Sequence, residues 1–409
     1  MAEATKYAYQ VRDRNGKLVS GKVAADSEAA VASKLTKMGY VPLTIKVDGG
    51  TGMSKDLKIP GMGKKKVKLK DLAIFSRQFA TMINSGLSML RSLNILCEQA
   101  ENPELGRVLK SVRADVEAGQ SLSGAMGKHP RVFPVLMVNM TRAGEVGGFL
   151  DTTMLQIAEN YEAEVRLRGK VKAALTYPVV VFILAMLMCV IMLIFVVPVF
   201  ATMFDGLGGK LPLPTQILVI MSKGLKTFLP LVVIVGVGLS YTWKKYRLDP
   251  RVRNVVDPLK LKIPVFGNLF AKIALARFAR NLGTLLSSGV PILQSLDIVA
   301  DTTGSIVISR AIRSVQESVR QGDSISKPLA THDVFPSMVV QMMSVGEDTG
   351  ALDQMLQKIA EFYDQEVEAT TESLTALIEP LMIAFLGGVV GSMIVALYMP
   401  IFSIFKLIG

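Results

Sequence analysis

The chain has 409 residues and a formal net charge of +12, and half of its residues are hydrophobic while a fifth are charged. This combination fits a membrane protein with large water-exposed parts, because the charges avoid three long windows. The two cysteines, Cys97 and Cys189, exclude a disulfide framework and favour reduced thiols in a reducing compartment.

Residues 1–47 are predicted to form a small N-terminal α/β module. Apolar residues alternate from Tyr7, Asn15–Gly16 is typical of a hairpin turn, and a return strand follows. Ser27 can cap a helix that runs to about Met38, and another strand is expected behind it. The first residues lack the apolar core of a signal peptide, so we expect a cytoplasmic N-terminus.

Residues 48–68 are predicted to be a flexible linker rich in glycine and lysine. Its basic run contains Lys64, Lys65 and Lys66, which could contact nucleic acid. No nucleic-acid-binding motif accompanies the run. We therefore interpret it as a juxtamembrane segment that binds anionic lipid or an acidic partner.

From residue 69 the hydrophobic period becomes helical, and residues 69–172 are predicted to form a cytoplasmic bundle. Short breaks divide this stretch into about six helices, and loops that short favour antiparallel neighbours. The breaks fall at Ser85–Gly86, Asn102–Pro103, Gly119–Gln120, His129–Pro130 and Gly147–Gly148.

The second half of the chain repeats the first with an offset of about 202 residues. The segment from Arg77 to Leu87 reappears from Arg280 to Val290, and paired Phe–Pro, Gly–Glu and Leu–Asp steps continue the match. Self-similarity at a fixed offset indicates an internal duplication. Residues 244–378 are therefore predicted to form a second six-helix antiparallel bundle in the cytoplasm.

Three windows without charge, at residues 173–204, 227–243 and 380–405, predict transmembrane helices over residues 173–204, 217–243 and 379–405, with Lys223 and Lys226 of the second helix at the outer interface. A helix needs about 20 apolar residues to cross the hydrocarbon core, and the first and third windows exceed that length. The second window is shorter, so a hairpin or a surface helix over residues 211–243 is the alternative. The predicted fold is a mainly α membrane protein with two duplicated bundles and three transmembrane helices.

Orientation in the membrane follows from the positions of lysine and arginine. One basic cluster, from Arg166 to Lys172, precedes the first span, and another, from Lys244 to Arg253, follows the second. The positive-inside rule places both clusters in the cytoplasm. Residues 205–216 are then an outer loop, and a multi-pass chain with a cytoplasmic N-terminus and a periplasmic C-terminus results.

The sequence predicts no catalytic, cofactor-binding or metal site. It contains no P-loop, no Gly-x-Ser-x-Gly and no His-Glu-x-x-His pattern. Its two histidines, His129 and His332, lie in equivalent turns of the two copies and are interpreted as structural. The spans lack the charge at membrane depth that ion and proton pathways require, and the first and third offer only Thr202, Ser392 and Ser403, so transport is disfavoured.

Four polar or small positions are candidates for partner binding or for turn structure: Gly144 with Glu145, and Gly346 with Glu347. Each pair is expected where a bundle helix ends, because glycine commonly closes a helix. In the third span Gly387 and Gly391 form a small-residue face that allows close helix approach. That face would pack against another span of this chain or against a second copy.

Several of these segments resemble one known family. The stretch Arg77–Leu87, the membrane entry from Lys170 to Pro178 and the repeated Gly-Glu-x-x-Gly-x-Leu pattern are similar to signatures of the type II secretion F-domain family. The resemblance covers about residues 1–405, and the N-terminal module with its lysine-rich linker is closest to the type IV pilus branch. Thr349 stands opposite Gly147, so the geometry of that turn is expected to differ.

The resemblance implies a non-enzymatic platform, or scaffold, in the bacterial inner membrane. Such platforms couple hexameric pilus assembly and retraction ATPases to pilin subunits, beside inner-membrane pilus alignment proteins. It further implies a homo-oligomer in contact with membrane lipids, with no cofactor and no nucleic-acid partner. A type II secretion platform acting on pseudopilins is the alternative, and a membrane transporter would be a different class altogether.

Overall fold

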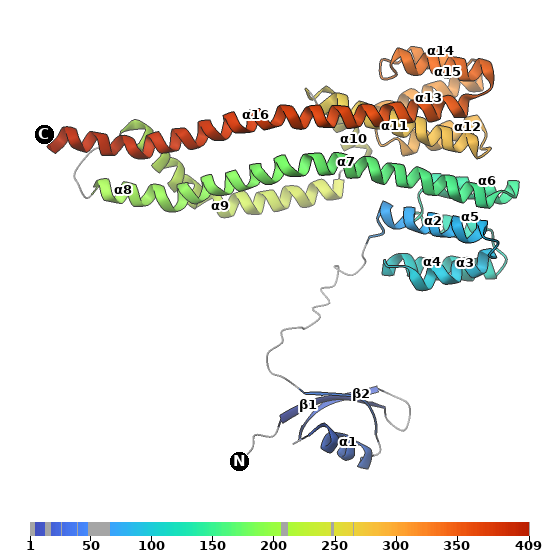
Figure 1. Ribbon diagram of the computed structural model, residues 1–409, viewed down its shortest axis with the longest axis horizontal. Coiled ribbons are helices and arrows are strands. Elements are labelled where there is room, and N and C mark those ends of the chain that lie inside the picture. Colours follow the sequence, from blue (N-terminus) through green and yellow to red (C-terminus); the bar gives the residue numbers. More distant parts are fainter. Residues whose placement is uncertain are drawn as a thin grey trace. The chain divides into compact units, whose positions relative to one another are not determined.

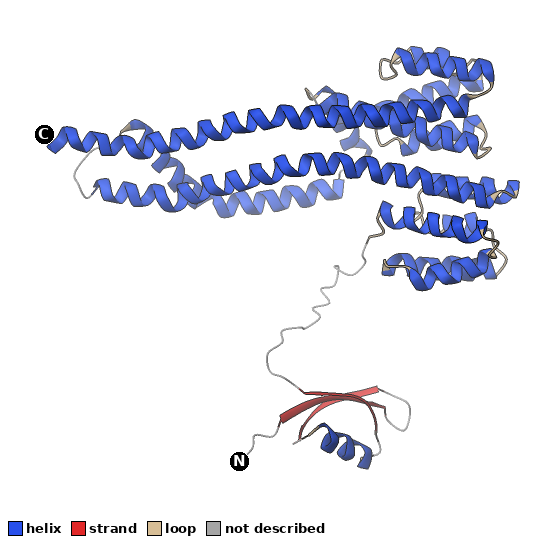
Figure 2. Ribbon diagram, in the orientation of Figure 1, coloured by secondary structure: helices blue, strands red, loops and turns tan. Residues whose placement is uncertain are grey.

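The computed structural model divides the chain into two compact units, Met1–Lys64 and Lys65–Gly409 (Figure 1). Strands occur in the first unit, whereas the second is built from helices (Figure 2). The structure describes residues 5–12, 18–25, 27–38, 40–47, 66–205, 212–246, 249–264 and 266–408.

The N-terminal unit is a three-stranded antiparallel sheet with one helix. Its elements are β1 (Thr5–Arg12), β2 (Leu18–Ala25), α1 (Glu28–Lys37) and β3 (Val41–Val47), and the strand order is β2-β1-β3. Ser27 accepts a hydrogen bond from the Ala30 N–H at 3.3 Å and so caps α1. Val31 and Leu35 of the helix are buried in a small apolar core. The hairpin residues Asn15–Gly16 lie outside the described residues.

The first bundle lies within residues 66–205, all of which the structure describes. Its helices are α2 (Leu69–Asn84), α3 (Met89–Gln99), α4 (Pro103–Glu117), α5 (Leu122–Gly127), α6 (Val135–Gly147) and the first part of α7 (Leu150–Ile191). The breaks fall where the sequence predicts them. Gly86 has a left-handed φ of +81°, and Asn102 accepts a hydrogen bond from the Glu104 N–H at 3.0 Å to begin α4.

The second bundle repeats this order and carries one additional helix before it. Its helices are α10 (Pro250–Lys262), α11 (Phe266–Ser287), α12 (Ile292–Thr302), α13 (Ile306–Arg320), α14 (Ser326–Ala330), α15 (Ser337–Thr349) and the first part of α16 (Leu352–Ile408). Helices α11 to α16 correspond to α2 to α7 of the first bundle. Helix α10 was not predicted from the sequence, and no helix corresponds to it within residues 66–205.

Each bundle continues without a break into an apolar helix. Helix α7 runs on through a π-helical turn, Met192–Val196, into α8 (Val197–Asp205), and α16 extends for 57 residues. Two helical stretches, Leu150–Met203 and Leu352–Met399, are long and apolar enough to cross a membrane. Helix α9 (Leu213–Tyr246) lies between them in sequence and is 34 residues long. Residues 213–216, which the sequence assigned to the outer loop, are therefore helical.

The two bundles share one continuous apolar core. In the first bundle Phe75 and Phe133 lie 6.1 Å apart between ring centroids, and in the second Phe278 and Phe335 lie 5.1 Å apart. Both phenylalanines of each pair are buried. Because buried residues of both copies belong to one cluster, the duplicated halves form a single packed body instead of two separate cores.

Candidate functional site

The Gly–Glu pairs connect three helices within each bundle. The Glu145 carboxylate accepts hydrogen bonds from the backbone N–H of Leu122 and, at 3.0 Å, from that of Ser123, where α5 begins. In the second copy Glu347 accepts from the N–H of Ile325 at 2.9 Å, where α14 begins. A carboxylate there satisfies unpaired N–H groups and complements the positive end of the helix dipole. The two glutamates are therefore tertiary helix caps.

Gly144 and Gly346 do not themselves close their helices, although the first helix does end at the predicted break, Gly147–Gly148. Helix α6 continues to Gly147, and α15 continues to Thr349. The residues with left-handed φ are Gly148 at +77° and Gly350 at +71°, and these end the helices because glycine has no Cβ to clash in that conformation.

Gly144 and Gly346 have another role, which is close packing between helices. A Cβ added at Gly144 would lie 2.6 Å from Thr153 Oγ1 on α7. A Cβ added at Gly346 would lie 3.0 Å from the Leu352 Cα on α16. Both glycines are buried, so the last two helices of each bundle approach each other at a point where a larger residue does not fit.

An ion pair joins α2 to α7 in the first bundle, and an equivalent pair joins α11 to α16 in the second. Arg77 on α2 donates to Glu162 on α7 through two hydrogen bonds of 2.8 Å. The repeat-related Arg280 on α11 donates to Asp364 on α16. The hydrogen bond from Arg77 lowers the pKa of Glu162, and the nearby charge adds to that effect although partial burial opposes it. These arginines begin the repeated sequence motif, so the duplication includes its polar contacts.

Glu164 on α7 links the first bundle to the second. It accepts hydrogen bonds from Arg277 on α11 at 2.7 Å and from Arg168 on its own helix at 2.8 Å. Burial acts to raise the pKa of Glu164, but the guanidinium groups of Arg277 and Arg168 outweigh it and hold that pKa below its ordinary value. Glu164 is therefore an ionised, largely buried anchor between the two copies.

Two further polar contacts extend this connection along the same helix face. Asn160 donates to Thr284 Oγ1 at 3.1 Å, and the Ser288 hydroxyl donates to Gln156 at 2.6 Å. Residues four apart lie on one side of a helix. We call this row the inter-bundle seam, formed by Gln156, Asn160 and Glu164 of α7 with Arg277 and Thr284 of α11 and Ser288 just after it.

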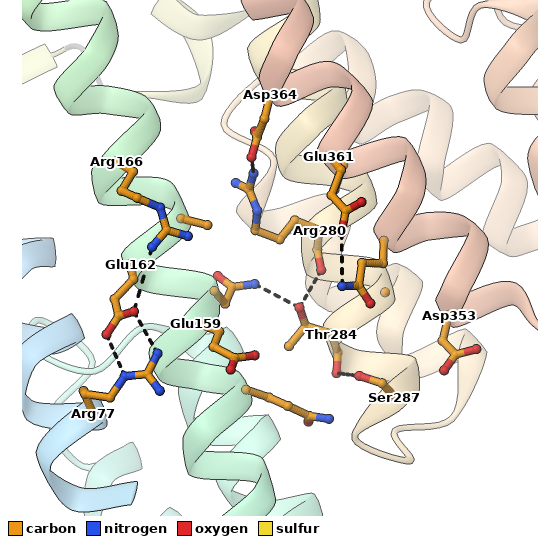
Figure 3. Close-up of a pocket in the computed structure, with 16 residues that line it drawn as sticks. Arg77, Glu159, Glu162, Arg166, Arg280, Thr284, Ser287, Asp353, Glu361 and Asp364 are labelled. Carbon is orange, nitrogen blue, oxygen red and sulfur yellow. Dashed lines mark hydrogen bonds and ion pairs between the residues drawn. The ribbon is translucent and has the colours of Figure 1, made fainter. Parts of the chain in front are cut away.

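A polar cavity of about 550 Å³ lies beside the seam, and Figure 3 shows the residues around it. Helices α2 and α7 contribute one side of its lining, and α11 and α16 contribute the other. Its charged lining residues are Arg77, Glu159, Glu162, Arg166, Arg280, Asp353, Glu361 and Asp364. No group of three His, Cys, Asp or Glu side chains is placed to hold a metal ion in the described part of the chain. The seam and the cavity thus form a polar junction between two packed bundles.

The remaining candidates lie apart from this junction. Lys66 is exposed, while Lys64 and Lys65 lie outside the described residues. Gly387 and Gly391 lie on the apolar part of α16, where an added Cβ would meet no described atom within 4 Å. Packing of that face against another span of the same chain, one of the two expected arrangements, is therefore absent among the described residues.

The repeated halves of the chain also match one protein family. Residues 75–198 and 278–400 each match the family described as "Type II secretion system (T2SS), protein F", and residues 1–46 match its N-terminal domain. The chain belongs to the type II secretion system protein F family. The two matched segments coincide with the two bundles and the apolar helices that continue from them.

By their names, the relatives with full-length similarity include type IV pilus assembly proteins and a type II secretion protein. The chain is 43% identical to "Type IV pilus assembly protein PilC" of Myxococcus xanthus, over 98% of this chain and 95% of that protein. It is also 43% identical to the PilC protein of Thermus thermophilus, over 97% and 98% of the two chains. The identity to "Type II secretion system protein F" of Xanthomonas campestris is 33%, over 98% and 99%.

Within this family framework, sequence reasoning missed the seam. Its polar residues recur every four positions on α7, a spacing that was visible in the sequence. The partner was not visible, because Arg277 corresponds to Ile74 in the first copy and so breaks the repeat. Glu366, the counterpart of Glu164, pairs instead with Lys272 inside its own bundle at 2.7 Å.

Proposed function

We propose that this protein is the inner-membrane platform of a type IV pilus machine. It would couple a cytoplasmic assembly ATPase to the insertion or removal of pilin subunits. The observation that carries this proposal is the full-length similarity to pilus assembly proteins, which exceeds that to a secretion protein, 43% against 33% identity. Domain order supports it as well, since both the N-terminal domain and the duplicated domain are present.

The proposed topology has three crossings, by residues 173–204, 217–243 and 379–405, with both bundles in the cytoplasm. Two of these crossings lie in helices of suitable length and apolarity. Helix α9 supports the third, because its 34 residues form one helix whose side chains are largely exposed and apolar. Lys244 and Lys245 at its end favour a cytoplasmic position there. The C-terminus would then lie in the periplasm.

The proposed mechanism is mechanical, without catalysis by the chain itself. A motor that pushes or turns the bundles would move the membrane helices with them, because α7 and α16 pass from bundle to apolar segment as continuous helices. The shared core and the inter-bundle seam support concerted movement of both bundles. Proposed partners are the assembly and retraction ATPases, pilins, alignment proteins, membrane lipids and a second copy of the chain.

Cysteine labelling of intact cells tests the topology. In a background without Cys97 and Cys189, a membrane-impermeant maleimide should label Gly208→Cys and should not label Ser111→Cys or Ser314→Cys. Labelling of Ser314→Cys in unbroken cells would overturn the proposed arrangement.

Deletion of the gene tests the choice between pilus assembly and secretion. Cells that lack the chain should lose surface pili while retaining secretion of folded proteins. The opposite pattern would favour the secretion alternative, and nucleotide hydrolysis by the purified chain would refute the scaffold mechanism.

A further inference from the structure

Helix α10 has one face attached to the second bundle. Asp257 on that face is 6% exposed and accepts hydrogen bonds from Lys260 at 3.2 Å and from the Ile306 N–H at 3.2 Å. Because Ile306 begins α13, Asp257 acts as a cap for that helix. The orientation of α10 on the bundle is therefore fixed by a buried carboxylate.

The opposite face of α10 combines aliphatic and basic residues. Val255 and Leu259 lie four residues apart on this face and are 69% and 62% exposed, and Ile263, the C-cap residue that follows the helix, is 42% exposed. Arg251 and Lys262 flank this stripe on the same face, and within the described part of the chain neither side chain forms an ion pair. An aliphatic stripe with basic residues beside it is typical of helices that lie in the membrane interface.

The position of α10 in the chain places this face close to the membrane. Helix α9 ends at Tyr246, and α10 begins at Pro250. The two ends are four residue steps apart, which span at most about 14 Å. If α9 crosses the membrane as proposed above, α10 must begin within that distance of the cytoplasmic surface. The lysines at the end of α9 favour the same level.

We propose that α10 lies in the cytoplasmic interface of the bilayer, with Val255, Leu259 and Ile263 among the acyl chains and with Arg251 and Lys262 on anionic headgroups. This inference rests on the proposed crossing of α9. Anionic lipid matches the exposed charge, whereas a protein partner would need an acidic and apolar surface at the same depth. The helix would then fix the height of the second bundle above the membrane.

Collision-accessibility measurements on the full chain test this placement. The chain, without its native cysteines, is reconstituted into nanodiscs of phosphatidylglycerol and phosphatidylethanolamine and spin-labelled at Leu259→Cys. Ser314→Cys, on the exposed surface of α13, serves as the water control, and Val235→Cys on α9 serves as the membrane control. The label at residue 259 should favour oxygen over a nickel chelate, as the label at 235 does, and the label at 314 should show the reverse.

The charge component is tested in the same discs. Arg251→Gln with Lys262→Gln should shift the equilibrium constant between immersed and water-exposed α10 about 30-fold toward water in anionic discs, at roughly 1 kcal/mol per charge. The shift should vanish in discs of phosphatidylcholine alone. An unchanged immersed fraction in the anionic discs would overturn the role of the headgroups.

Three outcomes distinguish a failure of the interfacial position of α10 from a failure of the membrane crossing by α9. If residue 259 is as open to the nickel chelate as residue 314 while residue 235 favours oxygen, α10 lies in water and the inference fails. If residue 259 is shielded from both reagents, a protein surface covers the helix, and the inference also fails. If residue 235 is open to nickel while residue 259 is not, the crossing of α9 fails and α10 remains interfacial.

Discussion

At the scale of single residues, the two copies use the same acidic contact. Glu145 and Glu347 each bind backbone N–H groups at the start of a short helix in the middle of their bundle. Replacing Glu347 with Ala should lower the free energy of unfolding by about 1–2 kcal/mol, because it leaves those N–H groups without their partner. Thermal unfolding of the purified protein in detergent measures this change.

The neighbouring Asp348→Ala is the matched control for this prediction. Asp348 is exposed, so its replacement should change stability by less than about 0.5 kcal/mol. If Glu347→Ala melts like Asp348→Ala but abolishes pili, the glutamate contacts a partner and the capping role is insufficient. The sequence singled out both glutamates but could not show the cap, because the contact joins residues 22 positions apart.

Glu164 gives the inter-bundle seam a dependence on pH. Its folded-state pKa lies below the ordinary value of 4.5, so its contribution to stability is complete above that pH and is lost as pH falls through the lowered pKa. Glu164→Gln should lower the free energy of unfolding by about 3 kcal/mol at neutral pH, because it leaves the partly buried Arg277 without its counter-charge. The difference from wild type should shrink as unfolding is measured in increasingly acidic buffers.

Glu361→Gln provides the comparison for the pH series. Glu361 is exposed and pairs with Lys358 on the surface of α16 at 3.0 Å, a contact worth about 0–1 kcal/mol. A difference between wild type and Glu164→Gln that stays constant down to the acid unfolding transition would contradict the role of the ionised carboxylate.

At the scale of helices, the distance from an added Cβ to the neighbouring helix decides which glycine substitutions destabilise the protein. Gly144→Ala should destabilise the protein by about 1–3 kcal/mol, because the new methyl group would overlap Thr153 where α6 meets α7. Gly387→Ala is the control, since its Cβ would meet open space and Ala favours a helix. Thermal unfolding should therefore separate the two variants. Equal melting temperatures would show that α6 and α7 can move apart at no cost.

Helix boundaries were largely predictable, and the exceptions have identifiable causes. Caps and positive-φ glycines act locally, so breaks such as Gly86 and Asn102 could be read from neighbouring residues. Gly144 was misassigned because a glycine needed for close packing looks the same in sequence as one that ends a helix. Helix α10 was missed although Asp249 caps it and Pro250 begins it, because the repeated sequence segments that predicted the other bundle helices do not include it.

At the scale of the whole molecule, the duplication predicted two bundles but not the core and the contacts that they share. A repeat specifies contacts inside each copy, such as Arg77 with Glu162 and its counterpart Arg280 with Asp364. Contacts between the copies depend on residues that differ between the two repeats. The contact of Glu164 with Arg277 is one of these, because Ile74 stands at the position of Arg277 in the first copy. The shared core and the seam could therefore not be predicted from the sequence, because no periodic signal in it describes an interface between two unlike partners.

The distribution of charge over the whole chain supports the final prediction. Residues 1–172 carry 27 basic and 17 acidic side chains, whereas residues 244–378 carry 15 of each. We propose that the basic linker faces the motor or anionic lipid. Changing Lys64, Lys65 and Lys66 to Glu should weaken binding to the purified assembly ATPase or to anionic vesicles, and the melting temperature should stay constant because a linker makes little packing contact.

A second set of lysines separates local from total charge in this experiment. Changing Lys34, Lys37 and Lys327 to Glu alters the net charge by the same amount at exposed positions elsewhere. Raising the salt concentration should mimic the linker change, because exposed charges are screened beyond about 8 Å at physiological ionic strength. If both triple variants bind equally weakly in co-sedimentation, overall charge attracts the partner and the linker has no specific role. If the linker variant binds like wild type, the basic run is not part of the motor-facing or lipid-facing surface.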